Sequence, residues 1–198
     1  IETLKGITKW YSTSHKVSDI SSDINKAFKS MKSDRPRPTA LEIPPDILAA
    51  RGSATPIPAA QRKTPTLNLH DIDQAAAILT KAQRPIIWAG GGVIISDSTK
   101  VLTQLAETLG AIVVTTPEGK GSIPENHQLS GGVGYYGHGS SGWYAEKADV
   151  VLAIGTRLTQ QMRGPTALKS SQQLIHIDID QEVINKNHPA SVSVIADA

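Results

Sequence analysis

The chain has 198 residues, of which 39% are apolar and 19% are charged. This composition suits one sizeable globular domain with an appendage, and a formal net charge of +2 argues against nucleic acid as a partner. The absence of cysteine excludes disulfides, thiolate metal ligands and a cysteine nucleophile, and is typical of the reducing cytosol. No apolar run approaches the roughly 20 residues that span a bilayer. We therefore expect a cytoplasmic protein that binds neither membranes nor nucleic acid.

The first quarter of the chain shows only a small amount of predicted structure. Residues 17–31 place apolar side chains at helical spacing, two prolines at 36 and 38 must end that helix, and residues 39–43 indicate a short strand. One helix and one strand bury little surface, so we expect residues 1–48 to be the tail of a domain that begins upstream. The first methionine is Met31, which favours a fragment produced by truncation or proteolysis.

The remainder of the chain divides into a linker and a regular alternation of elements. Residues 49–68 are rich in proline and small polar residues and lack periodicity, as an interdomain linker does. Beyond them, apolar periodicity predicts helices in 71–82 and 98–109, and strands in 85–89, 111–115, 149–154, 174–179 and 192–195. A glycine-rich stretch at 131–142 leads into a further short helix, expected before the strand at 149–154.

The strands are apolar throughout instead of alternating, which is typical of parallel strands covered on both faces. Residues 150–154, Val-Val-Leu-Ala-Ile, are the clearest example. Strands and helices that take turns in this way predict an α/β fold with an open, doubly wound parallel sheet and right-handed crossovers. Ligands of such sheets bind beyond the carboxyl ends of the strands, so the turns that leave the strands are the candidate sites.

Two of these turns have residues suited to a phosphate. Gly90, Gly91 and Gly92 follow the strand at 85–89, and glycines there let backbone N–H groups approach an anion closely. A tight turn without a ligand explains them equally well, because the third glycine of the dinucleotide fingerprint is missing. Gly155 and Arg157 follow the most apolar strand, where the arginine is either a clamp for phosphate or ribose or an ordinary surface residue.

Acidic residues mark a third turn. Alternation places His176 and Asp178 on one side of the strand at 174–179 and Asp180 just after it on the same side, and an acid at a strand end suits ribose hydroxyls. We expect Asp180 to cap the following helix and His176 to be a buried core residue. A fourth turn, at 115–127, lacks phosphate-loop spacing and is expected to pack on a neighbouring domain. Since the six histidines show no ligand spacing and no nucleophile is evident, we predict no catalytic residue and no metal site.

Several motifs together resemble a known family. They are Thr-Pro-Glu-Gly-Lys-Gly-Ser-Ile-Pro-Glu at 116–125, Ala-Asp-Val-Val-Leu-Ala-Ile-Gly-Thr-Arg at 148–157, Ile-Asp-Ile-Asp at 177–180, and Arg-Pro-Arg-Pro-Thr-Ala-Leu-Glu-Ile-Pro-Pro-Asp at 35–46. Their combination and order resemble the thiamine-diphosphate enzymes, in particular acetolactate synthase and its carboligase and decarboxylase relatives. The resemblance implies that 1–48 end a pyrimidine-binding domain, that 49–68 are a linker, and that 69–198 form a Rossmann-like central domain of the nucleotide-binding type.

The resemblance also implies a set of cofactor contacts. Flavin-binding members hold FAD through a linker arginine, the glycine turn, the Gly-x-Arg turn and two acids. The matching residues in this sequence are Arg62, Gly90, Gly91, Gly92, Gly155, Arg157, Asp178 and Asp197. The family's Gly-Met-His-Gly stretch is replaced by Gly-Tyr-Tyr-Gly at 134–137, which alters a contact on the flavin side. FAD, ADP and the absence of any nucleotide therefore stay open.

The catalytic groups that the resemblance implies lie outside the chain. Family members activate thiamine diphosphate with a glutamate in the N-terminal domain, which hydrogen-bonds the pyrimidine ring of the cofactor. They anchor its diphosphate through magnesium, held by a Gly-Asp-Gly motif with a downstream asparagine in the C-terminal domain. The chain is thus expected to be a non-catalytic part of a lyase or transferase for 2-keto acid carboligation or decarboxylation. Its partners would be the missing domains, in a homodimer or homotetramer.

Two other functions stay open. One is a structural central domain that binds no nucleotide. The other is an unrelated NAD-binding Rossmann enzyme such as a sirtuin-like deacylase, against which the missing zinc-binding cysteines and the incomplete glycine fingerprint both count.

Overall fold

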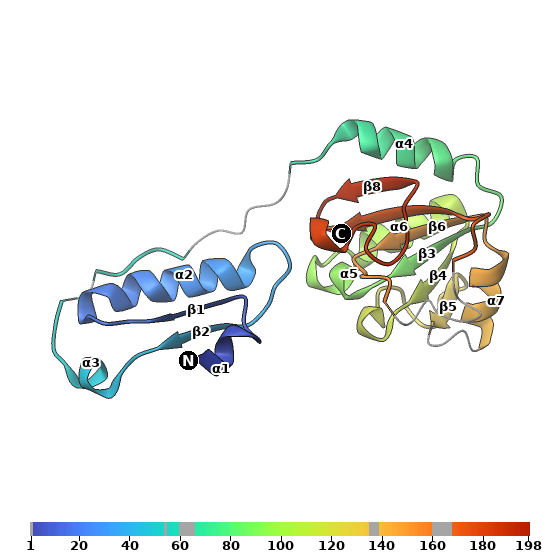
Figure 1. Ribbon diagram of the computed structural model, residues 1–198. Helices are drawn as coiled ribbons and strands as arrows, with labels where there is room; N and C mark the ends of the chain where they lie inside the picture. Colours follow the sequence, from blue (N-terminus) through green and yellow to red (C-terminus); the bar gives the residue numbers. More distant parts are fainter. Residues whose placement is uncertain (1, 54, 60–65, 135–138, 160–167) are drawn as a thin grey trace. The chain divides into compact units, whose positions relative to one another are not determined.

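The chain forms two compact units, seen in a computed structural model that describes residues 2–53, 55–59, 66–134, 139–159 and 168–198 (Figure 1). The N-terminal unit is Ile1–Thr64 and the C-terminal unit is Pro65–Ala198. Within the described ranges, no helix is both long and apolar enough to cross a bilayer.

The N-terminal unit is a small β-α-β arrangement. Strand β1 (Trp10–Thr13) pairs in parallel with β2 (Thr39–Glu42), and α2 (Ile20–Lys32), preceded by the short helix η1 (Val17–Asp19), connects them. Two short helices, α1 (Glu2–Lys5) and α3 (Pro45–Ala49), flank this arrangement. The helix expected at 17–31 and the strand expected at 39–43 are confirmed, as α2 and β2. Strand β1 was not expected, because its four half-buried residues form neither an apolar run nor a strict alternation.

A buried carboxylate fastens α2 to the end of β1. Asp23 accepts hydrogen bonds from Ser14 Oγ at 2.9 Å and from Lys26 Nζ at 3.1 Å. Burial raises the pKa of Asp23, but these donors and the nearby positive charges lower it further, so that its pKa falls below the ordinary value. The side chain therefore stays ionised and bonded at neutral pH.

The C-terminal unit contains a six-stranded parallel sheet in the order β5-β4-β3-β6-β7-β8. Its elements in chain order are α4 (Leu69–Leu79), β3 (Pro85–Ala89), α5 (Gly91–Ile95), α6 (Thr99–Leu109), β4 (Ile112–Thr115), η2 (Pro117–Gly119), β5 (Ser130–Val133), α7 (Gly139–Lys147), β6 (Val150–Ile154), β7 (Gln173–Asp178), η5 (Gln181–Val183) and β8 (Val192–Ile195). The chain winds outward from β3 to β5, and then continues from β6 to β8 on the other side of β3. The predicted doubly wound parallel fold is confirmed.

Alternate residues of the four central strands, β4, β3, β6 and β7, enter two separate cores, one on each face of the sheet. On β3, Ile87 packs in the core that contains Leu102 of α6, whereas Trp88 packs in the core that contains Ala145 of α7. Helix α4 contributes Ala75 to the first core. Both faces of these central strands are therefore covered, which is the physical reason that they are mostly apolar.

Two elements of this unit differ from expectation. The glycine-rich stretch begins with strand β5, where a Cβ on Gly131 would lie 2.7 Å from Ile112 Cγ2, so the strand needs glycine to fit beside β4. Helix α5 starts at Gly91, whereas the only helix expected after the glycines was the one near Ser98. The predicted end of α6 at Gly110 is confirmed, with that glycine in the left-handed conformation at φ 59°.

Candidate functional site at the carboxyl edge of the sheet

The centre of the sheet provides a topological switch point. Strands β3 and β6 are adjacent and parallel, with Ala89 beside Ile154 at their carboxyl ends. The chain leaves β3 toward β4 and leaves β6 toward β7, on opposite sides of the pair. In open α/β sheets the crevice outside such a pair is where ligands bind. The turns after β3 and β6 are therefore the candidate site.

These two turns pack backbone against backbone. Gly90 N donates to Ile154 O at 2.9 Å, and Gly92 N donates to Gly155 O at 3.0 Å. A Cβ on Gly90 would lie 2.2 Å from Gly155 O, and a Cβ on Gly155 would lie 2.6 Å from Gly92 Cα. The close approach of these two backbone turns thus requires glycine at these positions, and two of the three glycine N–H groups of the first turn are already bonded.

A third turn, the one after β4, packs against the carboxyl end of β3. Thr116 N donates to Ala89 O at 2.9 Å, and a Cβ on Gly119 would lie 2.3 Å from that same oxygen. Gly91 is less crowded, since the nearest atom to an added Cβ there is Glu118 Cβ at 3.2 Å. Gly119 was not among the predicted residues. Its only sequence signal is its place in the Pro-Glu-Gly-Lys-Gly segment, which does not reveal what it packs against.

Arg157 lies in a tightly constrained turn after β6. It stands between two residues with positive φ, Gly155 at 59° and Leu158 at 47°. Its side chain is exposed, whereas its carbonyl oxygen accepts a hydrogen bond from Asn187 Nδ2 at 2.8 Å. The backbone of Arg157 is therefore fixed while its guanidinium group is free to meet a ligand.

The predicted acids are buried to different extents. Asp178 ends β7, is 4% exposed, and accepts a hydrogen bond from Asp180 N at 2.9 Å. Asp180 caps η5 by accepting from Glu182 N at 3.1 Å, as expected from the sequence. Asp197 follows β8 and is partly exposed. Of the two acids that the resemblance implies for the cofactor, Asp178 and Asp197, Asp197 is thus the more accessible.

Backbone hydrogen bonds bring the carboxyl ends of four strands together. Besides the bond from Gly90 to β6, Gly155 N donates to Ile177 O at 2.9 Å, and Ala196 N donates to Asp178 O at 3.1 Å. All the predicted site residues that the structure describes consequently lie along one edge of the sheet. Arg62 is outside the described residues, as are Tyr135, Tyr136 and Gly137 of the altered family stretch.

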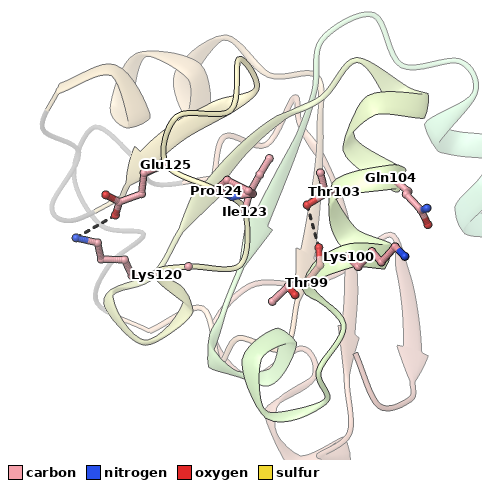
Figure 2. Close-up of a pocket in the computed structure, with 9 residues that line it drawn as sticks. Thr99, Lys100, Thr103, Gln104, Lys120, Ile123, Pro124 and Glu125 are labelled. Carbon is pink, nitrogen blue, oxygen red and sulfur yellow. Dashed lines mark hydrogen bonds and ion pairs between the residues drawn. The ribbon is translucent and has the colours of Figure 1, made fainter.

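A groove of about 680 Å³ lies at the same edge, between the first turns of α6 and the loop after β4 (Figure 2). Lys100 stands on its helix side, whereas Lys120 on its loop side pairs with Glu125 at 3.0 Å. None of the predicted residues lines it. No local pattern indicates this groove, because its two walls come from separate segments that meet only in the folded chain. Within the described residues, no group of three or more His, Asp or Glu side chains could hold a metal ion.

The topology and the glycine contacts define a Rossmann-like α/β domain. Residues 72–198 match the family described as "Thiamine pyrophosphate enzyme, central domain". The chain belongs to this family of thiamine pyrophosphate enzymes. The alternative prediction of an unrelated NAD-binding enzyme is therefore wrong.

Relatives extend this similarity over nearly the whole chain. A "Probable acetolactate synthase large subunit" of Methanocaldococcus jannaschii is 35% identical over 97% of this chain and 34% of its own length. An "Acetolactate synthase" of Mycobacterium bovis is 30% identical over 90% of this chain and 30% of its own length. The chain thus spans about a third of the curated relatives that it matches.

A solved structure confirms the fold. Benzoylformate decarboxylase from Polynucleobacter necessarius matches with a TM-score of 0.82 over 98% of this chain and 38% of that chain, at 18% sequence identity.

Proposed function

We propose that this chain supplies the central part of an acetolactate synthase-like enzyme that carboligates or decarboxylates 2-keto acids. The observation that carries the proposal is the 35% identity to a protein named acetolactate synthase over 97% of the chain. Thiamine diphosphate would supply the carbanion-stabilising chemistry in such an enzyme. The role of this chain is then to support the domains that bind the cofactor, in a homodimer or homotetramer.

An activity assay tests this assignment. The longer polypeptide that contains this sequence, supplied with thiamine diphosphate and magnesium, is expected to convert pyruvate to acetolactate or to release carbon dioxide from a 2-keto acid. The 198-residue chain under the same conditions is expected to show no turnover. A longer polypeptide that consumes no 2-keto acid would contradict the proposal, and so would turnover by the chain alone.

We further propose that the carboxyl edge binds the adenine nucleotide part of FAD or ADP. The exposed guanidinium of Arg157 suits a diphosphate, Gly91 is the least crowded glycine of the first turn, and the carboxylate of Asp197 suits ribose hydroxyls. Gly90 and Gly92 would act indirectly, because their N–H groups are bonded to β6 and its turn. The affinity for the nucleotide would thus depend more on Arg157 than on the glycine turn.

Calorimetric titration with ADP and with FAD tests this dependence. Arg157→Ala is expected to weaken binding about tenfold or more, since a charge-assisted contact is worth roughly 1.5–3 kcal/mol. Arg84→Ala is the matched control. It removes the same charge from an exposed arginine that precedes β3, at the opposite end of that strand, and should leave the affinity unchanged. If neither nucleotide binds the unaltered chain, the edge has a purely structural role.

A further inference from the structure

The turn that displays Arg157 has a strained backbone. Leu158 adopts φ 47° although it is a leucine, and its side chain is 2% exposed. Non-glycine residues rarely adopt this left-handed conformation, and they do so only where surrounding contacts enforce it. Contacts from outside the turn must therefore hold it in place.

A buried histidine provides the first of these contacts. His176 of β7 is 1% exposed, and its Nε2 lies 2.8 Å from Thr156 O. A carbonyl oxygen can only accept, so Nε2 must carry the proton and Nδ1 must be bare in the neutral ring. Nδ1 is buried and has no hydrogen-bond partner among the described residues. Burial lowers the pKa of His176, although the bond to Thr156 and the charge of Asp178 raise it, and the ring stays neutral.

The second contact comes from the segment after η5. Asn187 Nδ2 donates to Arg157 O at 2.8 Å. Thr156 O belongs to the peptide group before Arg157, and Arg157 O belongs to the peptide group after it. Hydrogen bonds from His176 and Asn187 therefore hold both peptide groups that flank Arg157. Inside the turn, Leu158 N donates to Thr156 Oγ1 at 3.3 Å.

We propose that His176 and Asn187 are positioning residues, which hold the strained turn Gly155 to Leu158 and thereby aim the Arg157 guanidinium at the diphosphate of a bound nucleotide. The proposal rests on the nucleotide-binding function proposed above. Neither side chain contacts the ligand itself. Each acts through a backbone carbonyl of the turn, so its effect on binding depends on the presence of Arg157.

The hold on the turn can be measured without any ligand. In ¹⁵N NMR spectra, His176 is expected as the neutral tautomer with the proton on Nε2. Hydrogen exchange of the Leu158 amide is expected to speed up about tenfold in His176→Leu, and to stay near the unaltered rate in His176→Gln, whose amide N–H can replace the donor. A proton on Nδ1, or equal exchange in the Leu and Gln variants, would overturn the proposal.

A double-mutant cycle measures the effect on ADP affinity. His176→Leu and Asn187→Ala are each expected to weaken ADP binding about tenfold in the unaltered chain, and to cause no further loss when Arg157 is already alanine. Asn126→Ala, at an exposed asparagine of the loop before β5, should have no effect.

The outcomes of the cycle separate the two proposals. Unchanged affinity in His176→Leu, or an undiminished loss in the Arg157→Ala background, would overturn the positioning role. If the unaltered chain binds neither ADP nor FAD, the proposed nucleotide function fails, and exchange of the Leu158 amide alone decides whether His176 holds the turn.

Discussion

Gly155→Ala is expected to destabilise the C-terminal unit by about 2–4 kcal/mol, because it combines two penalties. The residue has φ 59°, which costs an alanine roughly 1 kcal/mol. Its new Cβ would also lie 2.6 Å from Gly92 Cα, a backbone atom that cannot move without opening the contact between the turns after β3 and β6. Hydrogen exchange of the β6 amides reports the free energy of unfolding of this unit alone.

Gly110→Ala is a close control for this experiment. Gly110 has the same φ of 59°, but an added Cβ would have no neighbour within 4 Å. Its expected cost is therefore only the conformational penalty of about 1 kcal/mol. Equal losses of stability in the two variants would mean that backbone conformation, and not close packing of the two turns, accounts for the glycine at 155.

Trp88→Ala is expected to cost about 3–5 kcal/mol of unfolding free energy, the usual loss for truncating a fully buried large aromatic side chain. Trp88 is 0% exposed and fills the core on the α7 side of the sheet, where its ring also limits position 134 to glycine. Its Nε1 has no hydrogen-bond partner among the described residues. Trp88→Phe should therefore be milder than the alanine variant, because it keeps most of the ring volume and loses no hydrogen bond.

Trp143 supplies the comparison on the surface. It is 59% exposed on α7, so Trp143→Ala should cost less than about 1 kcal/mol. Urea unfolding followed by circular dichroism measures these variants on one scale. A loss for Trp88→Ala no larger than that for Trp143→Ala would contradict the placement of Trp88 in a packed core.

Local patterns were informative where one segment contains the whole signal. Residues 150–154 predicted a strand buried on both faces, and β6 is that strand. Leu109 followed by Gly110 predicted the end of α6 correctly, because the left-handed glycine is a local requirement. The predicted sheet edge was also informative, since in parallel strands the residues after each strand must meet at the same edge.

Local patterns failed where a residue owes its conformation to a distant segment. Strand β5 was missed, because its glycines suit a loop until β4 is placed beside them. The glycines at 90 to 92 suit either a phosphate or a tight turn, and no local pattern indicates that Gly90 and Gly92 pack against Gly155. The link from His176 to Thr156 likewise joins residues that are 20 positions apart.

The amino-acid sequence by itself determined the alternation of elements, the parallel doubly wound sheet and the edge at which the candidate residues gather. Hydrophobic periodicity and chain connectivity are sufficient for these features. Only the tertiary structure decided which N–H groups at that edge are already bonded, which acid is accessible, and how the turn of Arg157 is held. Those properties depend on distances between segments that are remote in the chain, and such distances are set only when the two cores pack.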